Sequence, residues 1–501
     1  MAATFMEVLD TSVANVSLPH IGGNLSATTE ESTWVLTSYL VSNAVILPIT
    51  GWLGRFFGRK KLLLLCITLF TIASVLCGLA PSLGFLVFAR ILQGAGGGAM
   101  LPISQAVLLE SFPPAKRGVA MAVFAMGVVV APILGPTLGG WITDNYSWRW
   151  IFYINLPVGI FAAGMSHLVI EDPPYIKKAR AADIDFAGFA LIAAGLGALQ
   201  ILLDKGQQAD WFESLWVRWT ALFSVLALAG FVVRELRAEH PIVDLRILKN
   251  RNFAVGVVLM TLLGGVLYGT TAALPIFLQT LLGYPALQSG LAMSPRGIGA
   301  FLTTMVVGRL VGRVSNRWLM FAGFSLLTVS SFWLGHINMD IAKKSVIWPS
   351  VLNGIAVSFI FVPLTTATMG RLDQVQISNA TGIFNLMRNL GGSVGIAGVT
   401  TLLERWSQVH QAALVSHLTL FDAAVRPELA AIQAGLSRTT GTYAASHQAW
   451  QVLYDRLLQQ AKLAAFVDNF RLFGFLCLAC IPMVFLFRAG RGARRPPEGV
   501  H

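Results

Sequence analysis

The sequence predicts an all-α integral membrane protein with fourteen membrane-spanning helices. Three observations support this prediction. Hydrophobic residues make up 55% of the 501-residue chain and charged residues only 12%, whereas soluble domains carry roughly 25% charged residues. The apolar residues fall into fourteen runs, each near the roughly 20 residues that a helix needs to cross a bilayer. Short clusters of Lys and Arg separate the runs, as in the loops on one side of a membrane.

The predicted spans form two groups of six, separated by a pair. We predict an amino-terminal six-helix bundle over 1–170, two inserted helices over 171–235 and a carboxyl-terminal six-helix bundle over 236–501. In order, the spans are 1–19, 33–54, 62–80, 84–109, 118–142, 149–170, 185–204, 214–233, 253–282, 287–308, 318–336, 346–369, 379–403 and 466–487. The stretches GWLGRFFGRKK (51–61) and GRLVGRVSNRW (308–318) are similar Gly/Arg turns at matching places in the two groups. Repeated halves of this kind are typical of membrane transport folds.

The loop charges predict the orientation of the spans. With an intracellular amino terminus, the inner loops and the carboxyl-terminal tail carry 22 Lys and Arg residues, and the short outer loops carry four. Because cytoplasmic loops are enriched in Lys and Arg, both termini are predicted to lie in the cytoplasm. The net charge of +12 is spread over these loops and is not gathered on one face, so no nucleic-acid partner is predicted.

One outer segment, residues 404–465, differs from the other loops because it is polar to amphipathic. Within it, Trp450, Leu453, Leu457 and Leu458 follow the spacing of an amphipathic helix, which we expect to continue into the last span. Long loops cross the membrane largely regardless of their charge, so a periplasmic position suits this segment. Two interpretations remain open: a helical cap on the protein's own bundle, or a docking surface for a partner.

The first span contains two acids. Glu7 and Asp10 are three residues apart, so they share one face of a helix. An ionised side chain at bilayer depth costs a few kcal/mol on insertion scales, so such an acid must face a cavity, find a partner or bind a proton.

No basic n-region precedes this run, so we predict no cleavable signal peptide. Pro19 ends the run after only 18 residues, so two explanations stay open: the natural start lies upstream, or the chain has been shortened.

Five stretches together resemble one transporter family. They are LDTSVANVSLP (9–19), GWLGRFFGRKK (51–61), LVFARILQGAGGG (86–98), APILGPTLGG (131–140) and WRWIFYINLPVG (148–159). In this order and spacing, the sequence resembles the major facilitator superfamily, and within it the fourteen-helix drug:proton antiporters of the EmrB and QacA type (the DHA2 family). The resemblance covers nearly the whole chain. It implies two six-helix bundles that rock about a site at the middle of the membrane.

The resemblance also implies that three charged residues take part in proton coupling. Asp10 lies at the position of the family's first-helix motif and is our first candidate for the coupling acid. Glu7 lies outside the motif, and it is a second titrating site, a cation-binding acid or a residue close to the inner surface. Arg90 belongs to the fourth-helix motif, which implies a part in proton transfer. A structural charge bonded to backbone carbonyls is the alternative for Arg90.

Two motifs imply a role in conformational change. Gly51, Gly58 and Arg59 belong to the loop after the second span, where the family usually places an acid at the position of Arg55. That acid serves as a latch, so Arg55 puts the latch in doubt, and simple positive-inside charges are the alternative. The fifth-helix motif implies a hinge and a contact between the halves, because small residues let helices approach closely and prolines bend them. Its residues are Pro132, Gly135, Pro136, Gly139 and Gly140.

Four further residues are candidates for lining a central cavity: Asn15, Tyr39, Arg296 and Arg388. For the two arginines, bonding to the backbone is the alternative. The sequence contains no P-loop, GxSxG or HExxH motif, so no enzyme activity is predicted. The CxxC of Cys477 and Cys480 has no second pair or His cluster beside it, so no metal site is predicted. The proton is the only coupling ion expected, without a cofactor.

Taken with the resemblance, these features imply proton-driven efflux of amphipathic, hydrophobic or cationic compounds across a bacterial inner membrane. A dedicated exporter of one metabolite, lipid or siderophore that works by the same antiport is the alternative, and residue types do not separate the two. The outer segment implies the inner-membrane subunit of a tripartite pump, with a periplasmic adaptor and an outer-membrane channel as partners.

Overall fold

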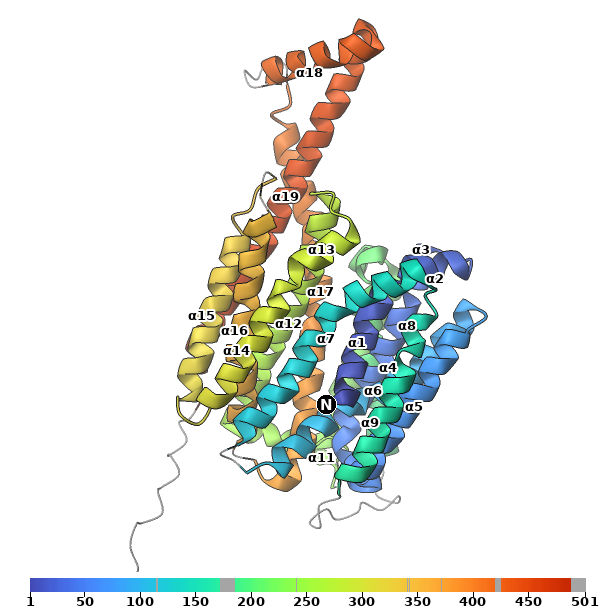
Figure 1. The fold of residues 1–501 in the computed structure, drawn as a ribbon, viewed down its shortest axis with the longest axis vertical. Coiled ribbons are helices and arrows are strands. Elements are labelled where there is room, and N and C mark those ends of the chain that lie inside the picture. Colours follow the sequence, from blue (N-terminus) through green and yellow to red (C-terminus); the bar gives the residue numbers. More distant parts are fainter. Residues whose placement is uncertain are drawn as a thin grey trace, which may run out of the picture.

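The computed structural model describes residues 1–113, 116–171, 185–239, 241–339, 341, 343–370, 372–419 and 425–487. Over these ranges the regular structure is helical (Figure 1), apart from one isolated bridge between Val311 and Val314. The prediction of an all-α membrane protein is therefore confirmed.

The amino-terminal bundle is built from the first six predicted spans. Its helices are α1 (Ala2–Val16), α2 (Leu18–Asn24), α3 (Thr29–Ser32), α4 (Trp34–Phe57), α5 (Arg59–Leu79), α6 (Leu83–Ser111), α7 (Arg117–Asn145), α8 (Trp150–Tyr153) and α9 (Asn155–Val169). Helix α1 packs on α7 and α9, α4 packs on α6, and α5 packs on α6 and α9. The first helix thus lies inside the bundle, in contact with several others.

The inserted pair and the carboxyl-terminal bundle follow. The pair is α10 (Phe186–Lys205) and α11 (Leu215–Arg237), with the short 3-10 helices η2 (Gln207–Ala209) and η3 (Trp211–Glu213) between them and η4 (Leu245–Lys249) after them. The second bundle consists of α12 (Arg251–Thr280), α13 (Ala286–Met293), α14 (Pro295–Leu310), α15 (Asn316–Leu334), α16 (Lys343–Met369), α17 (Gln374–Val415), α18 (Val425–Thr440) and α19 (Thr442–Val484). Within it, α12 packs on α17, and α16 packs on α14 and α15.

Each of the fourteen predicted spans corresponds to a helix or a helix pair. Ten helices in the described ranges are long and apolar enough to cross a membrane, and α7 makes eleven, with a bend of 42° between Pro132 and Thr137. The other three spans are α1, the pair α13 and α14, and the long helix α17. Because the bilayer offers no water to exposed peptide groups, helices are the natural form for these apolar runs.

The two Gly/Arg turns have the same backbone character. Gly58, which separates α4 from α5, has a φ of +82°, and Gly312, between α14 and α15, has a φ of +96°. Only glycine adopts this region without strain. The similarity of the two turns, predicted from the sequence, therefore extends to their conformation and supports the internal repeat.

Helices α4 and α6 of the first bundle pack on α17 of the second, and α7 packs on α13, α14 and α16, with the pairs α4 with α17 and α7 with α14 in most extensive contact. Their closest contacts gather at the end of the molecule opposite α18, which we call the base. A Cβ atom added to Gly51 would lie 2.8 Å from the Asn379 Cα atom, and one added to Gly118 would lie 2.8 Å from the Val311 Cβ atom. The two bundles are thus sealed against each other at the base in this structure.

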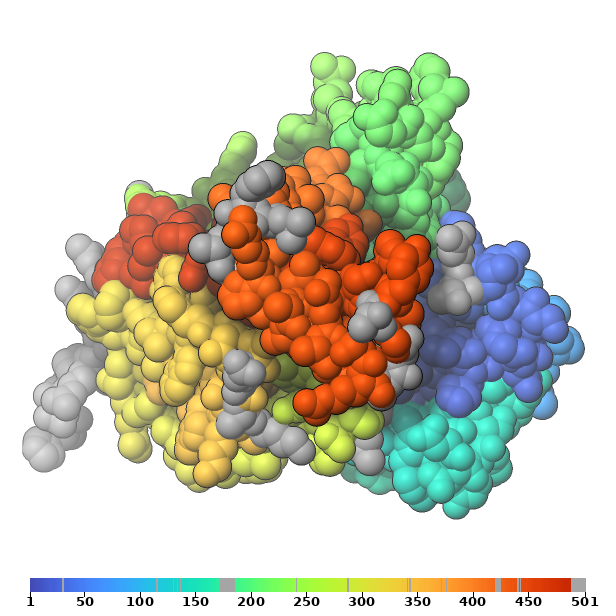
Figure 2. Space-filling view, turned by 90° about the horizontal axis from the view of Figure 1, so that it is seen from above, coloured from blue at the N-terminus to red at the C-terminus, as the bar shows by residue number. Residues whose placement is uncertain are grey.

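The inserted pair contacts both bundles. Helix α10 packs on α4 of the first bundle and on α17 of the second. The Thr37 hydroxyl donates to the Asp204 carboxyl group on the first side. On the second, the Ser393 hydroxyl donates to Gln200 Oε1 at 3.0 Å. Figure 2, viewed from the α18 end, shows this pair in green on one side of the molecule, beside both bundles.

The ends of α17 and α19 extend beyond the bundles as a stalk, with α18 at its tip (Figure 1). One continuous helix, α19, contains both the polar outer sequence and the last span. The apolar face of α18 is already covered, because Val425 and Leu429 pack against Ala449 and Leu453 of α19. Helix α18 therefore packs on its own stalk and, in the described structure, does not cap the transmembrane bundle (Figure 1). The positions that it leaves exposed combine the charged Arg426, Glu428 and Arg438 with small residues.

Candidate functional site

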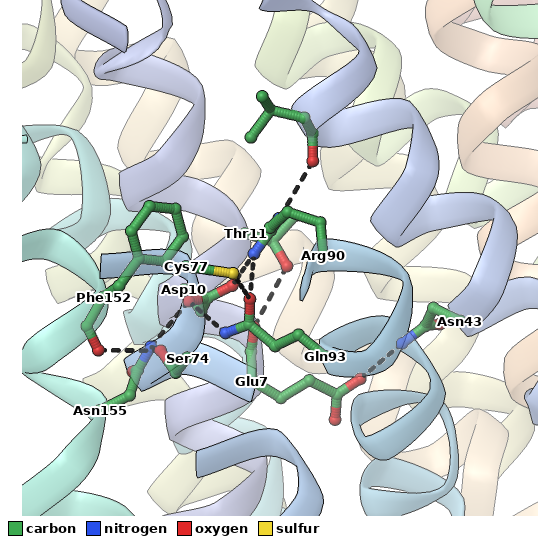
Figure 3. A network of polar contacts seen from close by, with 11 residues as sticks. Glu7, Asp10, Thr11, Asn43, Ser74, Cys77, Arg90, Gln93, Phe152 and Asn155 are labelled. Atoms are coloured by element: carbon green, nitrogen blue, oxygen red, sulfur yellow. Dashed lines mark hydrogen bonds and ion pairs between the residues drawn. The ribbon is translucent and has the colours of Figure 1, made fainter. Parts of the chain in front are cut away.

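Asp10 is the centre of a buried polar network in the amino-terminal bundle (Figure 3). Arg90 Nη1 donates to Asp10 Oδ2 at 2.6 Å. The amide groups of Gln93 and Asn155 donate to Asp10 Oδ1 at 2.9 Å and 2.7 Å. The side chains of Asp10 and Arg90 are only 1% and 0% exposed. The two charges therefore face each other in the interior of the bundle, and both oxygens of the carboxyl group accept hydrogen bonds.

Arg90 also bonds to the backbone. Its Nε group donates to the carbonyl oxygen of Val35 at 3.0 Å, and Nη1 donates to Gln93 Oε1 at 2.7 Å. Its guanidinium carbon lies 4.3 Å from the centre of the Tyr39 ring, a geometry that adds a cation–π attraction. Arg90 thus contacts both the candidate coupling acid, Asp10, and a backbone carbonyl, so neither of its two interpretations is excluded by its contacts. Tyr39, a candidate cavity residue, packs beneath Arg90 and is 2% exposed.

A second layer of polar groups connects the network to α5 and α8. Asn155 Nδ2 donates to Ser74 Oγ at 3.0 Å, and Ser74 Oγ donates to the Phe152 carbonyl oxygen at 2.8 Å. Sequence reasoning missed Gln93, Asn155 and Ser74. A signal was present for the first two, because both are polar residues inside motifs quoted for the family resemblance. Ser74 lies in an ordinary apolar run and gave no signal.

Glu7 lies one turn before Asp10 and has different neighbours. Its Oε1 atom accepts a hydrogen bond from Asn43 Nδ2 at 3.2 Å. Its Oε2 atom has no hydrogen-bond partner among the described residues, although the side chain is only 7% exposed. The guanidinium of Arg388, on α17 of the other bundle, is close enough to attract it electrostatically. Glu7 is thus an interior residue that faces the opposite bundle.

Polar groups continue across the interface beside Glu7. Asn385 Nδ2 of α17 donates to Gln105 Oε1 of α6 at 2.6 Å. Arg388 is 4% exposed, and its Nη2 group donates to Asn389 Oδ1 at 3.3 Å. Its Nε group has no hydrogen-bond partner within the described ranges. The two acids of α1 therefore belong to two connected regions, one inside the first bundle and one between the bundles.

Comparison with known proteins identifies the family. The sequence pattern of the Major Facilitator Superfamily matches residues 1–396. The chain belongs to this superfamily. It is similar to the fatty acid resistance protein FarB of Neisseria gonorrhoeae, with 40% identity over 98% of this chain and 96% of FarB. It is also similar to the multidrug export protein EmrB of Escherichia coli (strain K12), with 36% identity over 100% of this chain and 96% of EmrB.

Solved structures support the same fold. The human organic anion transporter MFSD10 (TETRAN) superimposes with a TM-score of 0.60 at 14% identity, over 95% of this chain and 98% of that chain. A double-Trp mutant of XylE gives a TM-score of 0.59 at 12% identity, over 98% of this chain and 96% of that chain. The protein is therefore a multi-pass membrane transporter of the major facilitator fold, and the family indicates a transporter and not an enzyme.

The superfamily's loop motif contains a buried ion pair. Arg59, at the start of α5, pairs with Glu110 near the end of α6, and the two side chains are 4% and 5% exposed. Sequence reasoning missed Glu110, the acid that directly follows the fourth predicted span at 84–109. Arg55 replaces the usual acid of this superfamily motif. An acid from another part of the chain, Asp244, is close enough to Arg55 to attract it electrostatically.

The superfamily's fifth-helix motif packs against helices of both bundles. Ser12 Oγ of α1 donates to the Pro132 carbonyl oxygen at 3.1 Å, and Gly135 lies directly against Ser12. A Cβ atom on Gly139 would lie 2.9 Å from Val13 Cγ1. Gly135 and Gly139 therefore bring α7 close to α1 within one bundle, while Thr137 of the same motif lies beside Gly290 of α13 in the other bundle. Gly118, earlier on α7, also contacts the other bundle.

The remaining residues of this motif and the remaining cavity candidates lie outside the Asp10 network. A Cβ atom on Gly140 would lie 4.0 Å from Val16 Cγ1, and the side chain of Pro136 lies outside the described residues. Asn15 is exposed on α1. Arg296 is 8% exposed, and its Nη1 group donates to Thr271 Oγ1 at 2.9 Å. Over the ranges described, no group of three or more His, Cys, Asp or Glu side chains could hold a metal ion.

Proposed function

We propose that this protein is a proton-driven efflux transporter of amphipathic and hydrophobic compounds, with Asp10 as the coupling acid. The observation that carries the proposal is the ion pair of Asp10 and Arg90, almost fully buried inside a membrane-spanning bundle. Removing two charges from water costs several kcal/mol for each ion. Ionisable residues retained inside membrane spans mark ion and substrate pathways, so this pair has the character of a transport site.

Protonation of Asp10 would change how α1 is held. Arg90 stays charged at physiological pH, so a neutral Asp10 would leave a buried guanidinium without its counter-charge. That state favours a different arrangement of α1 against α6 and α9, the helices that donate hydrogen bonds to Asp10. Proton and substrate then stabilise different arrangements, and each weakens the binding of the other, because such coupling is reciprocal. Exchange of protons for substrate follows.

The printed names of the relatives support the substrate class. EmrB is a multidrug export protein and FarB is a fatty acid resistance protein. Both names fit amphipathic or hydrophobic cargo and outward movement. The name of FarB also keeps the alternative of a dedicated exporter in view, and a panel that includes fatty acids and unrelated hydrophobic drugs separates the two.

The substitution Asp10→Asn tests the coupling role, because it removes the charge and keeps the shape. In proteoliposomes with a proton gradient, we expect Asp10→Asn to abolish uphill export and substrate-induced proton release. The control is Asp144→Asn, the same change at a side chain of the same bundle that is 72% exposed, and it should keep both activities. Uphill export by folded Asp10→Asn at the wild-type rate would rule out Asp10 as the coupling acid.

We further propose that the protein lies in a bacterial inner membrane with the α18 end in the periplasm and both termini in the cytoplasm. The enrichment of Lys and Arg in the loops of the base supports this orientation. The stalk then extends into the periplasm, where an adaptor of a tripartite pump would contact it. Because α19 covers the apolar face of α18, an adaptor would contact the rest of the stalk surface, which mixes charged residues with exposed apolar ones such as Val409 and Tyr443.

A short-stalk variant tests adaptor docking. Gln411 Nε2 of α17 donates to the Tyr454 hydroxyl of α19 at 2.8 Å, so a short Gly/Ser linker that replaces residues 413–452 can join the two helices near this contact. We expect the variant to keep substrate-induced proton release and to lose co-purification with the adaptor. Full retention of adaptor binding by the variant would contradict the docking role.

A further inference from the structure

Most buried cations of this protein have an acidic partner. Five Lys and Arg side chains are buried among the described residues: Arg59, Arg90, Lys205, Arg296 and Arg388. Arg59 forms an ion pair with Glu110, and Arg90 forms one with Asp10. Lys205 and Arg388 each have an acid near enough to attract them electrostatically, Asp204 and Glu7. Only Arg296 has no acid beside it within the part of the chain that the structure describes.

The position of Arg296 is well defined by its neighbours. It lies in the first turn of α14, and its backbone carbonyl is pressed against Gly354 of α16, where no Cβ atom would fit. Its Nη1 group reaches α12 and donates to Thr271 Oγ1 at 2.9 Å. Thr271 is nine residues before the end of α12 at Thr280, or about 14 Å along the helix axis. The guanidinium thus lies within the membrane-spanning part of the bundle.

The surroundings favour an anion at this place. A hydroxyl group cannot neutralise a guanidinium, so the charge of Arg296 is not compensated by Thr271. Helices α13 and α14 also pack on α7 of the other bundle. Binding sites of transporters with repeated halves lie at the interface of those halves.

We propose that Arg296 binds the carboxylate of an amphipathic anion that the protein exports. This inference rests on the proposed export function and adds the chemical class of the cargo. A guanidinium can donate two parallel hydrogen bonds to a carboxylate, and no hydrogen bond occupies Nε or Nη2 in the described structure. Leu267 lies one turn before Thr271 on α12 and is only partly buried, so it shares that face and suits a hydrocarbon chain.

Binding of matched twelve-carbon probes to purified full-length protein in phosphatidylcholine nanodiscs tests the proposal. Dodecanoate supplies the carboxylate, and dodecyltrimethylammonium supplies the same chain with a cation. We expect Arg296→Gln to weaken dodecanoate binding about tenfold or more, which is about 1.4 kcal/mol, and to change dodecyltrimethylammonium binding less than about twofold. Arg296→Lys should fall between the two. The control is Arg309→Gln, at an exposed position of the same helix, and it should bind dodecanoate as the wild type does.

Three results would overturn the proposal. The first is dodecanoate binding by folded Arg296→Gln within about twofold of the wild type. The second is an equal loss of both probes, which indicates a structural role for Arg296. The third is competitive loss of dodecanoate binding in discs that contain phosphatidylglycerol, because a lipid phosphate would then be the natural occupant. Failure of the export function is seen separately: dodecanoate would bind at Arg296 and release no protons from the wild-type protein.

Discussion

The seal at the base can be weakened by one methyl group. The ideal Cβ position on Gly51 of α4 lies 2.8 Å from the Cα atom and 3.0 Å from the backbone nitrogen of Asn379 on α17. These are backbone atoms, so no side-chain rotation can relieve the clash in Gly51→Ala. Overpacking of this kind typically costs 1–3 kcal/mol. If α4 and α17 separate when the base opens, the cost falls on the sealed state alone.

That cost predicts a large change in population. A difference of 1–3 kcal/mol changes the ratio of two conformations by about 5-fold to 150-fold, here in favour of the state with an open base. The control is Gly54→Ala, one turn further along α4, where the added Cβ atom would meet only Ser378 Oγ at 3.4 Å. That distance is ordinary van der Waals contact, so we expect a shift of less than about twofold, well below the range for a clash.

The distance between nitroxide labels at the base measures this shift. Lys61 on α5 and Trp318 on α15 are exposed and belong to different bundles, so cysteines at these positions report the separation of the bundles by pulsed electron spin resonance. The four buried native cysteines are first replaced by alanine. A distance distribution of Gly51→Ala equal to that of the wild type would refute the reasoning. An equal shift in Gly54→Ala would refute it too, because the two sites differ in the clash.

Two more outcomes follow from charged groups away from the Asp10 network. Glu110→Gln removes the carboxylate charge that faces the buried Arg59 guanidinium, so it should destabilise the protein by about 3–5 kcal/mol. The control is Glu428→Gln at the exposed pair with Arg456, which should cost at most about 1 kcal/mol. Equal shifts of the unfolding temperature in the two variants would contradict this prediction. In the loop before α4, the backbone N–H and hydroxyl groups of Thr28 lower the pKa of Glu31. The capping interaction is therefore present at neutral pH and is lost as the pH falls through this lowered pKa. The Thr28 amide donates to the Glu31 carboxylate at 2.8 Å, so its hydrogen-exchange protection should fall as the pH is lowered through that pKa. Glu31→Gln should remove that pH dependence, and protection that stays constant in the wild type would contradict the assignment.

The span pattern could be predicted because its cause is local. Each apolar run must satisfy its peptide groups within itself in lipid, so hydropathy alone indicates a helix. Helix ends are less predictable where nothing in the sequence stops the helix. The predicted span at 379–403 is part of α17, which runs from Gln374 to Val415, because a helix can continue into water beyond the membrane. The stalk arises in this way from α17 and α19.

The acids of the site could also be predicted, but their partners could not. Asp10 and Arg90 are conspicuous because they are charges within apolar runs. Which helix faces each of them depends on packing between distant segments, so the role of Asn155, 145 residues away from Asp10, needed the structure. The same limit applies to Gly135 and Gly139. Their spacing predicts close helix contact, yet it does not say that the partner is α1 and not the other bundle.

The lack of an acid beside Arg296 among the described residues also could not be read from the sequence. In the sequence, Arg296 and Arg388 look alike, because both are cations within predicted spans of the second bundle. The structure separates them, because Glu7 of α1 comes near Arg388 and no described acid comes near Arg296. One cation is therefore suited to hold the bundles together, and the other is suited to a ligand.

The arrangement of the two acids on α1 gives a route for coupling. Asp10 is held by α6 and α9 within the first bundle, and Glu7, one turn away, faces Asn43 and the Arg388 guanidinium of the second bundle. Both side chains are on one rigid helix, and α1 packs closely on α7 through Gly135 and Gly139. A shift of α1 that follows protonation of Asp10 must therefore move Glu7 relative to Arg388 and strain the contact with α7, which also carries the bundle contact at Gly118. Proton binding inside one bundle is in this way connected to two of the contacts between the bundles, one through Glu7 and one through α7, without a separate relay.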